Sequence, residues 1–399
     1  MSTEFGSIRD EVMAQSSGRR FGDGLAVGPD LRGAAEVAVT QALGPLAGAR
    51  PDLLCVFVCG SGDDAAAAGL RVMELAGART AIGATAGGVI GDGRGVEGEP
   101  AIAVWAAALP GVTVRPVRLE AGLDMMETGS AGLPQPRADD RVGVLLVDPS
   151  SFPIARFLDR CNAAYPEFPL VGGLASGAGA SGNRLFLDGE IHRDGGVGFL
   201  LGGDVAVRTI VSQGCRPIGP TMTVTRAEQN ILIELAGLPA YVRLRDILGS
   251  LSPAERTLAG RGLHLGIAMN EYAEDHGRGD FLIRGVLGAD PQSGAVAVGD
   301  VVEPGQTVRF QVRDAEAADE DLTELLAGAV AEGPARGALL FSCNGRGRFM
   351  FPTADHDVEA VRAGLRTGGV AGFFAAGEIG PVGGRNQLHG FTASVLAFR

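Results

Sequence analysis

Short runs of apolar residues, each stopped by glycine, proline or polar residues, recur along the whole chain. A run of this length between turn residues is typical of a buried β-strand. Three stretches share one order of elements: a buried strand, a helix with apolar residues at helical spacing, a second strand and a closing strand. Their first strands are predicted at Leu53–Cys59, Val142–Val147 and Ala338–Cys343. This order predicts about three degenerate strand-helix-strand-hairpin repeats.

The remaining elements of the repeats follow from the same pattern. A strand over Phe21–Val27 and a helix capped by Asp30 precede the first repeat. The helices are predicted at Asp63–Gly77, Phe152–Ala164 and Val358–Leu365, and the second strands at Thr80–Ile90, Pro169–Gly177 and Val370–Ala376. Two hairpins are predicted, Ala101–Ala108 with Val112–Leu119 and Gly196–Gly202 with Val205–Val211, and the last strand is Phe391–Phe398.

A connector separates the second and third repeats. It is expected to begin with two helical stretches over Arg226–Leu248, broken at Pro239, and to end with an acidic helix over Ala315–Ala331. Four short strands lie between them. Long antiparallel segments exclude a purely parallel sheet. The predicted fold class is therefore α/β, with mixed β-sheets packed with flanking helices, and two sheets packed together would bury this many strands.

The length of 399 residues exceeds one ordinary core. Residues 1–20 are polar and aperiodic, which predicts a mobile N-terminal tail. The boundary between two domains is placed near Thr225, giving one domain over 21–225 and a second over 226–399.

Composition removes several classes of function. The net charge of −13 argues against a nucleic-acid or anionic-membrane surface. All 34 basic residues are arginine, so no lysine is present for a Schiff base or pyridoxal phosphate. The five cysteines and five histidines are scattered without a CxxC or HExxH motif, which favours buried reduced thiols over metal ligands. We expect no metal and no cofactor. Without a signal peptide or a transmembrane-length run, a soluble cytoplasmic protein is expected.

One glycine motif resembles a dinucleotide fingerprint in its position. Gly60-Ser61-Gly62-Asp63-Asp64 follows a predicted strand and opens a predicted helix. The two aspartates would repel a pyrophosphate at the helix N-terminus. No acid follows the next strand to hold a ribose, so a structural turn is the favoured interpretation.

Two strand ends near the C-terminus carry the candidate chemistry. Asn344, Arg346 and Arg348 lie in a glycine-rich turn after one predicted strand, where guanidinium groups and backbone N–H groups could hold a carboxylate or phosphate. The alternative is a surface turn whose arginines pair with the acidic excess. Glu378 follows the next strand. It would either pair structurally with Arg346 or Arg284, or face a pocket and hold a ligand ammonium.

An arginine with a carboxylate is the pair that an amino-acid zwitterion needs, so a small-molecule site is predicted here. His389 and Thr392 flank Gly390 on the last strand, where His389 is either a pocket donor or a satisfied structural histidine. The rival interpretation is an enzyme, because Cys343, Asn344 and His389 are the makings of a thiol nucleophile with its base and orienting group. A buried inert cysteine is the commoner outcome.

Several stretches together resemble the FIST family: NILIELAGLPAYVRLRDILG at 230–249, FLIRGVLG at 281–288, FSCNGRG at 341–347, GFFAAGEIGP at 372–381 and LHGFTA at 388–393. The FIST N and FIST C parts would cover about residues 21–225 and 226–399. The resemblance implies a sensory domain of bacterial signal transduction, proposed to bind small ligands such as amino acids. Relatives are fused to kinase, cyclase or chemoreceptor outputs, or to an F-box, so a protein-interaction adaptor is a third interpretation. No such module is seen here, which predicts a stand-alone member whose signalling partner is a separate protein.

Overall fold

The computed structural model describes residues 18–120, 135–177, 182–271, 276 and 278–399. The chain forms two compact units, and each is described by itself. Unit 1 runs to Val211 and resumes at Leu325, and unit 2 spans Ser212–Glu324. The predicted tail over residues 1–20 lies outside the described residues except for its last three, and the first strand already begins at Arg20.

Unit 1 contains three six-stranded sheets, which we name the first, second and third sheets. The order in the first is β1 (Arg20–Val27), β6 (Ala101–Ala108), β2 (Leu53–Cys59), β3 (Thr80–Ala86), β10 (Leu185–Leu187) and β11 (Glu190–His192). The order in the second is β7 (Val112–Leu119), β12 (Gly196–Gly203), β8 (Asp140–Val147), β9 (Leu170–Leu174), β24 (Glu378–Val382) and β25 (Arg385–His389). The order in the third is β13 (Val207–Ser212), β26 (Ala393–Phe398), β22 (Gly337–Cys343), β23 (Gly369–Ala375), β4 (Gly88–Gly91) and β5 (Arg94–Glu97).

The three sheets share one plan. In each, the predicted first strand of a repeat lies inside the sheet, parallel to the second strand and antiparallel to the closing strand. These trios are β2 with β3 and β6, β8 with β9 and β12, and β22 with β23 and β26. The predicted α/β class with mixed sheets is confirmed. The count of three repeats stays a prediction, although this common plan favours it.

Each sheet is completed by a hairpin from another part of the chain. The hairpin β4–β5 follows β3 of the first sheet but pairs with β23 of the third. The hairpin β10–β11 follows β9 of the second sheet but pairs with β3 of the first. The hairpin β24–β25 follows β23 of the third sheet but pairs with β9 of the second. The exchange is therefore cyclic, and none of the three sheets is built from one continuous segment.

The observed strand pairing corrects three predictions. Thr80–Ile90 is two strands in different sheets, β3 and β4. The two predicted hairpins are also wrong, because β6 and β7 lie in different sheets, as do β12 and β13. The physical reason is that β6 already pairs with β1 and β2, and β12 with β7 and β8, so the next strand finds no free edge. Two packed sheets were expected, whereas unit 1 has three.

One apolar core lies among the three sheets. Aromatic rings from different sheets meet in it: Phe57 stacks on Phe373 with centroids 5.0 Å apart, and Trp105 lies 5.1 Å from Phe398. The close approach of β22 and β23 requires Gly372, because a side chain there would collide with the carbonyl of Leu340.

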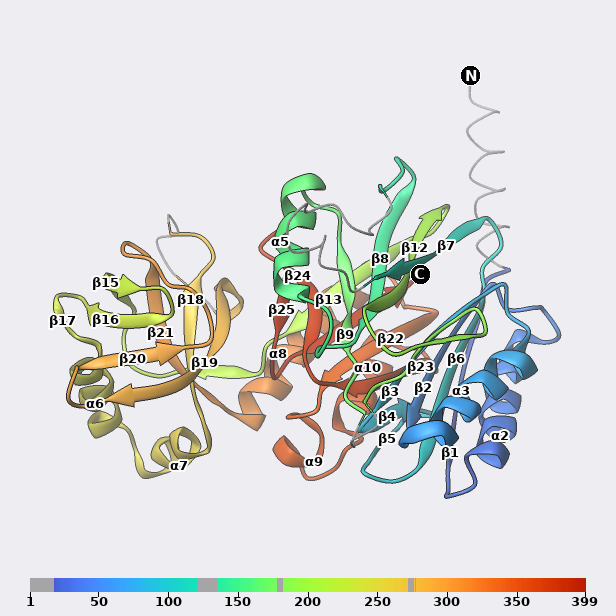
Figure 1. The fold of residues 1–399 in the computed structure, drawn as a ribbon, viewed down its shortest axis with the longest axis horizontal. Coiled ribbons are helices and arrows are strands. Elements are labelled where there is room, and N and C mark those ends of the chain that lie inside the picture. The colour runs from blue at the N-terminus through green and yellow to red at the C-terminus, as the bar shows by residue number, and fades with distance from the viewer. Residues whose placement is uncertain (1–17, 121–134, 178–181, 272–275, 277) are drawn as a thin grey trace. The chain divides into compact units, whose positions relative to one another are not determined.

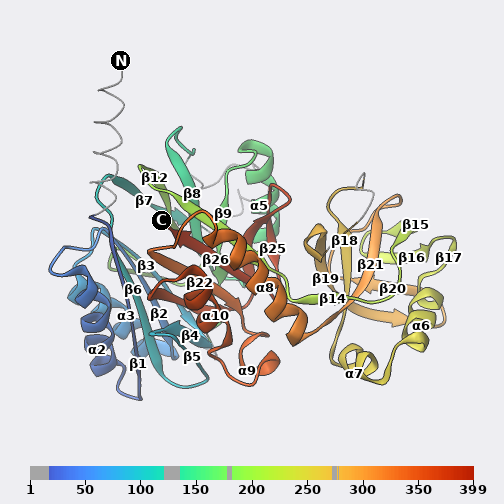
Figure 2. The ribbon, with the colours of Figure 1, turned by 180° about the vertical axis from the view of Figure 1, so that it is seen from behind.

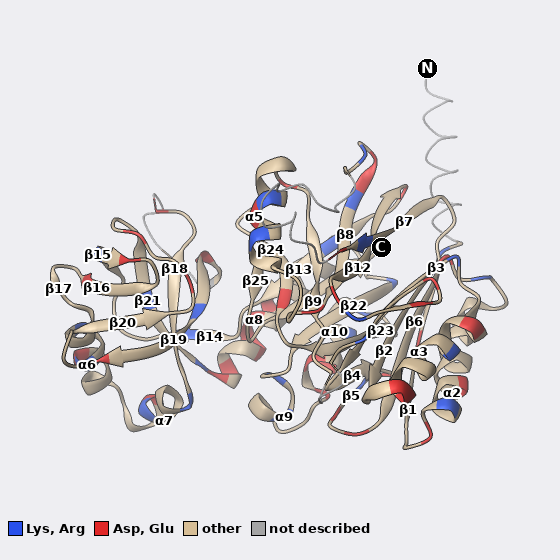
Figure 3. Ribbon diagram, in the orientation of Figure 1, with Lys and Arg blue, Asp and Glu red and all other residues tan. Residues whose placement is uncertain are grey.

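Helices cover the outer faces of the sheets. On the first sheet α2 (Leu31–Leu43) and α3 (Gly62–Ala76) bury an alanine-rich face, as Figures 1 and 2 show. Asp30 caps α2 as predicted, and α3 ends at Gly77 in the left-handed conformation. The charged residues of these helices lie on their outer sides, whereas the strands beneath are almost uniformly uncharged (Figure 3). The other described helices of unit 1 are α5 (Ile154–Ala164), α9 (Gly347–Met350), α10 (His356–Leu365) and the 3-10 turn Gly44–Leu46, and the boundary between the units falls within α8 (Ala315–Val330).

Unit 2 is a strongly curved antiparallel sheet that closes on itself, because β21 pairs with both β15 and β18. Its strands are β14 (Cys215–Pro217), β15 (Met222–Glu228), β16 (Ile231–Leu235), β17 (Leu238–Pro239), β18 (Leu263–Ala268), β19 (Phe281–Asp290), β20 (Ala295–Val298) and β21 (Thr307–Arg313). Its helices are α6 (Ala240–Ser250) and α7 (Pro253–Arg261), with a 3-10 turn at Arg278–Asp280. The helical stretch predicted before Pro239 is wrong, because Met222–Leu235 forms strands.

Candidate functional site

The predicted site residues of unit 1 gather where the third sheet meets the hairpin that it gives to the second. The central strand β22 ends at Cys343, whose backbone N–H donates to the carbonyl of Thr392 at 2.9 Å. The backbone N–H of the next residue, Asn344, donates to the carbonyl oxygen of Ala375 on β23 at 2.8 Å. Glu378 is the first residue of β24, paired with Gly173 on β9 and with His389 on β25. Two sheets thus bring Cys343, Asn344 and Glu378 into one region. That the predicted site residues line one cavity stays a prediction.

Arg346 is fully buried and pairs with Asp357 on α10. Its Nε donates to Oδ2 at 2.7 Å and its Nη2 donates to Oδ1 at 2.8 Å, while both side chains are almost inaccessible to solvent. Nη1 reaches the carbonyl of Phe391 at 3.5 Å, and the guanidinium carbon lies 5.3 Å from the centre of the Phe351 ring. This is the bidentate geometry in which arginine binds a carboxylate most strongly. The anion that Arg346 holds is therefore supplied by the protein itself.

Two further groups fix Asp357. The hydroxyl of Ser342 donates to Oδ2 at 2.6 Å, and Nδ1 of His356 lies 3.0 Å from Oδ1. The His356 ring stacks on Phe351 with centroids 3.5 Å apart. Burial opposes the charge of Asp357, but the positive charge and hydrogen bonds of Arg346, with the bonds from His356 and Ser342, hold its pKa well below the usual range.

Among the described residues, no cation pairs with Glu378 as Arg346 pairs with Asp357. The side chain of Glu378 is fully buried, and Oε2 accepts a hydrogen bond from the backbone N–H of Thr392 at 3.1 Å. Oε1 has no hydrogen-bond partner within the part of the chain that the structure describes. Burial raises the pKa of Glu378 well above its ordinary value, and the Thr392 N–H, the Cys343 thiol and the more distant charge of Arg346 offset this only in part. A buried carboxylate left in this state is costly unless it is protonated or meets a donor.

Cys343 lies beside Glu378 and is nearly inaccessible. The N–H of Gly345 donates to its Sγ at 3.4 Å, and Sγ lies 3.8 Å from Oδ1 of Asn344. Burial, reinforced by the negative charge of Glu378, raises the pKa of the thiol to about 12. The sulfur is therefore a neutral thiol at physiological pH, and it interacts with Glu378.

His389 and Thr392 are also buried. Nε2 of His389 lies 3.0 Å from the carbonyl oxygen of Gly380 within the same hairpin. The hydroxyl of Thr392 donates to the carbonyl of Gly390 at 3.2 Å, and its backbone holds both Glu378 and Cys343. Phe391, between Gly390 and Thr392, has a φ of 63°, which is rare for an aromatic residue.

Asn344 and Arg348 are exposed at the rim of this cluster. The backbone N–H of Arg348 donates to Oε2 of Glu97, at 2.8 Å, and this glutamate comes from the exchanged strand β5. A side chain at Gly347 would collide with the same carboxylate. The glycine-rich turn therefore does receive a carboxylate, and it belongs to the first repeat.

Arg284 belongs to unit 2, where β19 carries it, and its Nε donates to Asp300 at 2.6 Å. The structure describes the other six predicted ligand-binding residues in unit 1. Four residues of the cluster had not been predicted from the sequence: Ser342, Asp357, Phe391 and Glu97. A signal existed for Asp357, which follows the predicted turn and opens a helix, but none existed for Glu97, which is far away in the chain.

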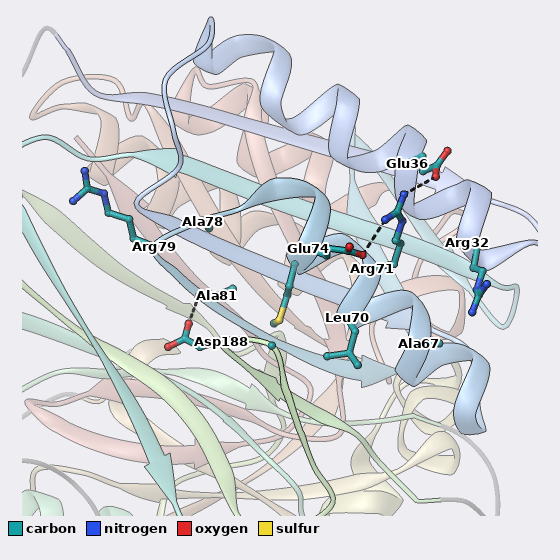
Figure 4. Close-up of a pocket in the computed structure, with 12 residues that line it drawn as sticks. Arg32, Glu36, Ala67, Leu70, Arg71, Glu74, Ala78, Arg79, Ala81 and Asp188 are labelled. Atoms are coloured by element: carbon teal, nitrogen blue, oxygen red, sulfur yellow. Dashed lines mark hydrogen bonds and ion pairs between the residues drawn. The ribbon is translucent and has the colours of Figure 1, made fainter.

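Two cavities lie away from this cluster. The larger, of about 870 Å³, is a groove along α2 and α3 that reaches the β10–β11 turn at Asp188 (Figure 4). Arg71 crosses it between Glu36, at 3.1 Å, and Glu74, at 2.9 Å, so its charge is already neutralised. The smaller, of about 460 Å³, lies near Arg50 and Pro110.

The described residues lack two kinds of feature. Over those parts of the chain, no helix has the length and apolar character needed to cross a membrane. Across the same residues, no group of three or more histidine, cysteine, aspartate and glutamate side chains could hold a metal ion.

Comparison with known proteins places these residues in a family. Residues 52–238 match the FIST N domain and residues 240–381 match the FIST C domain. Uncharacterized proteins from two strains of Mycobacterium tuberculosis, CDC 1551 / Oshkosh and ATCC 25618 / H37Rv, are each 44% identical over 387 residues, covering 95% of this chain and 99% of the relative. One from Mycobacterium bovis is 43% identical, covering 95% and 98%. FIST domains are associated with sensory roles in signal transduction. The chain therefore belongs to the FIST family, with a FIST N segment followed by a FIST C segment.

Proposed function

We propose that this chain is a sensory protein that binds a small ligand, an amino acid or another small carboxylate, and passes the bound state to a separate signalling protein. The sensory role is that of the family, and the ligand and partner are the proposal. The site we propose is the cluster at the end of β22 and the start of β24. Its members are Asn344, Arg346, Arg348, Glu378, His389 and Thr392. Arg284 stays a separate prediction, because it belongs to unit 2.

The observation that carries this proposal is the state of Glu378. Its Oε1 is buried and has no hydrogen-bond partner among the described residues. Structural carboxylates are normally satisfied, and those that are not mark strain or function. Arg346 shows the contrast, since its partner Asp357 is fully satisfied. In this proposal Arg346 does not bind the ligand directly, but its guanidinium places a positive charge near the site.

The rival function as a thiol enzyme receives less support. A nucleophilic cysteine needs a thiolate at working pH, and such residues lie in partly exposed, electropositive surroundings. Cys343 is buried beside an acid, and its thiol has a pKa raised to about 12. The groups around its thiol include Asn344, Gly345, Phe391 and Glu378. Nε2 of His389 lies 3.0 Å from the carbonyl oxygen of Gly380.

The test is a thermal-shift screen of the purified protein against amino acids and small carboxylates. A ligand that binds only the folded state raises the melting temperature in proportion to the logarithm of its concentration. We expect at least one such ligand to stabilise the wild type and the control Glu359→Gln, which changes an exposed residue of α10. The same ligand should not stabilise Glu378→Gln. Stabilisation of all three proteins alike would place the site elsewhere.

A further inference from the structure

The charged groups around Glu378 leave the cluster with one acid too many. Cys343 faces it from β22, Arg346 from the turn after β22, and Asp357 from α10. His389 lies directly opposite it on β25. Arg346 and Asp357 form a closed pair through two hydrogen bonds, so the guanidinium charge is already matched. Within the described parts of the chain, Glu378 remains as the acid without a counter-ion.

A ligand carboxylate would make this imbalance worse. To bind Arg346 it would have to displace Asp357 from a buried bidentate pair, which leaves that aspartate unpaired. To bind elsewhere in the cluster it would place a negative charge beside Glu378 and oppose the ionisation of that acid. An ammonium group would instead supply the missing cation, and its N–H groups match an oxygen that lacks a donor.

We propose that Glu378 receives the amino group of the ligand and releases its own proton to solvent as the ligand binds. This inference rests on the proposed function and specifies its chemistry. In the empty protein Glu378 is a neutral carboxylic acid. The incoming group is R–NH₃⁺, and the complex holds R–NH₃⁺ against the carboxylate of Glu378, with one proton passed to the buffer. The charge on the two sides is equal, and no bond other than the O–H bond of Glu378 is broken.

Access to Oε1 involves the segment Gly390–Thr392. The Phe391 ring lies over Gly345, where an added Cβ would be 2.5 Å from the ring. Next to Gly390 there is open space, since an added Cβ there would meet nothing within 4 Å. The Thr392 N–H holds Oε2, so the segment covers the cluster and also bonds to the acid.

The raised pKa of Glu378 in the empty protein, caused mainly by burial, is in accord with the neutral form. It also gives the sign of the pH dependence. Below that pKa each bound ammonium displaces a proton, so affinity rises with pH by up to tenfold per unit. The rise stops where the empty site is already ionised, and affinity falls once the amine itself loses its proton.

The experiment uses four probes that share a three-carbon skeleton: propylamine, β-alanine, propanol and propionate. We expect propylamine and β-alanine to stabilise the full-length protein in thermal melts, and propanol and propionate to have no effect. Calorimetry with propylamine in two buffers of different ionisation enthalpy should show up to one proton released per ligand bound. Glu378→Gln should weaken propylamine binding roughly thirtyfold or more, while Glu359→Gln leaves it unchanged.

The outcomes separate this inference from the proposed function. If neither amine stabilises the wild type while propionate or another carboxylate does, ligand binding stands and the inference is overturned. Propylamine binding without proton release also overturns it, as does equal binding by Glu378→Gln that is shown by its melt to be folded. If no amine, amino acid or carboxylate binds at any pH between 5 and 9, in roughly the range where stability is greatest, both proposals fail.

Discussion

Arg346 and Asp357 face each other as a buried, two-bonded ion pair, although a single turn and the short helix α9 separate them in the chain. Breaking such a pair by removing one partner leaves an uncompensated buried charge and costs roughly 3–5 kcal/mol. We therefore expect Asp357→Asn and Arg346→Met each to lower the free energy of unfolding by about that amount, measured by urea denaturation at pH 7. The control Glu359→Gln should change it by less than about 0.5 kcal/mol. Losses below about 1 kcal/mol would show that the pair is not buried as described.

Glu378 makes the stability of the protein depend on pH in a defined direction. Its folded pKa is raised above the unfolded value, so its contribution is fully present below the unfolded pKa and is lost as pH rises towards the folded pKa. Glu378→Gln resembles the protonated form and does not titrate. We expect the variant to melt near the wild type at about pH 4.5, which is close to the reference value. The melting temperature of Glu378→Gln should then exceed that of the wild type by a margin that grows as pH rises. A difference that shrinks with rising pH would mean that the folded pKa is not raised.

The thiol of Cys343 should be unreactive towards alkylating reagents in the folded protein. With a thiol pKa of about 12 and almost no exposure, it should react with iodoacetamide only as fast as the protein unfolds, as mass spectrometry of the modified peptide would measure. Cys343→Ser should leave binding of any ligand found in the screen within a few-fold. Rapid alkylation at pH 7, or loss of function in Cys343→Ser with normal binding by Glu378→Gln, would favour the thiol enzyme instead.

Gly345 and Phe391 provide a test of the covering segment. An alanine at Gly345 would press on the Phe391 ring, and overpacking of this kind typically costs about 1–3 kcal/mol. The double variant Gly345→Ala, Phe391→Ala removes the clash, so the two substitutions should be non-additive in urea denaturation. Gly390→Ala is the matched control, because its new methyl group meets open space. Simple additivity would show that the ring does not lie on Gly345.

The strands were predictable because an unbroken apolar run between turn residues is typical of a buried strand. Leu53–Cys59 is an unbroken apolar run, and all seven of its residues are buried in β2. The segment Ile231–Leu235 was wrongly predicted to be helical, because Ile231, Leu232 and Leu235 have helical spacing. Its hairpin turn at Ala236 and Gly237, both with positive φ, lacks the usual Asn-Gly signal.

The pairing of the strands was beyond the sequence pattern. A strand after a short turn shows the same alternation whether it folds back on its neighbour or crosses to another sheet. Nothing in Gly88–Glu97 indicates that its partner is β23. The predicted neighbourhood of Arg346 and Glu378 followed from two adjacent strand ends. The acidic partner of Arg346 could not be predicted in the same way. Asp355, Asp357 and Glu359 are near equivalents in sequence, and only burial distinguishes Asp357.

The cyclic exchange of hairpins has a consequence for synthesis of the protein on the ribosome. The hairpin β4–β5 is made early, yet its partner β23 is synthesised much later, and β9 waits in the same way for β24. Until then the nascent chain carries open apolar strand edges, which are the sites where partly folded proteins aggregate. Such long-range closure also makes folding slow. Unit 1 of this FIST protein therefore cannot complete its sheets before β23 and β24 have been synthesised, and a ribosome that stalls earlier leaves the sheets without these strands.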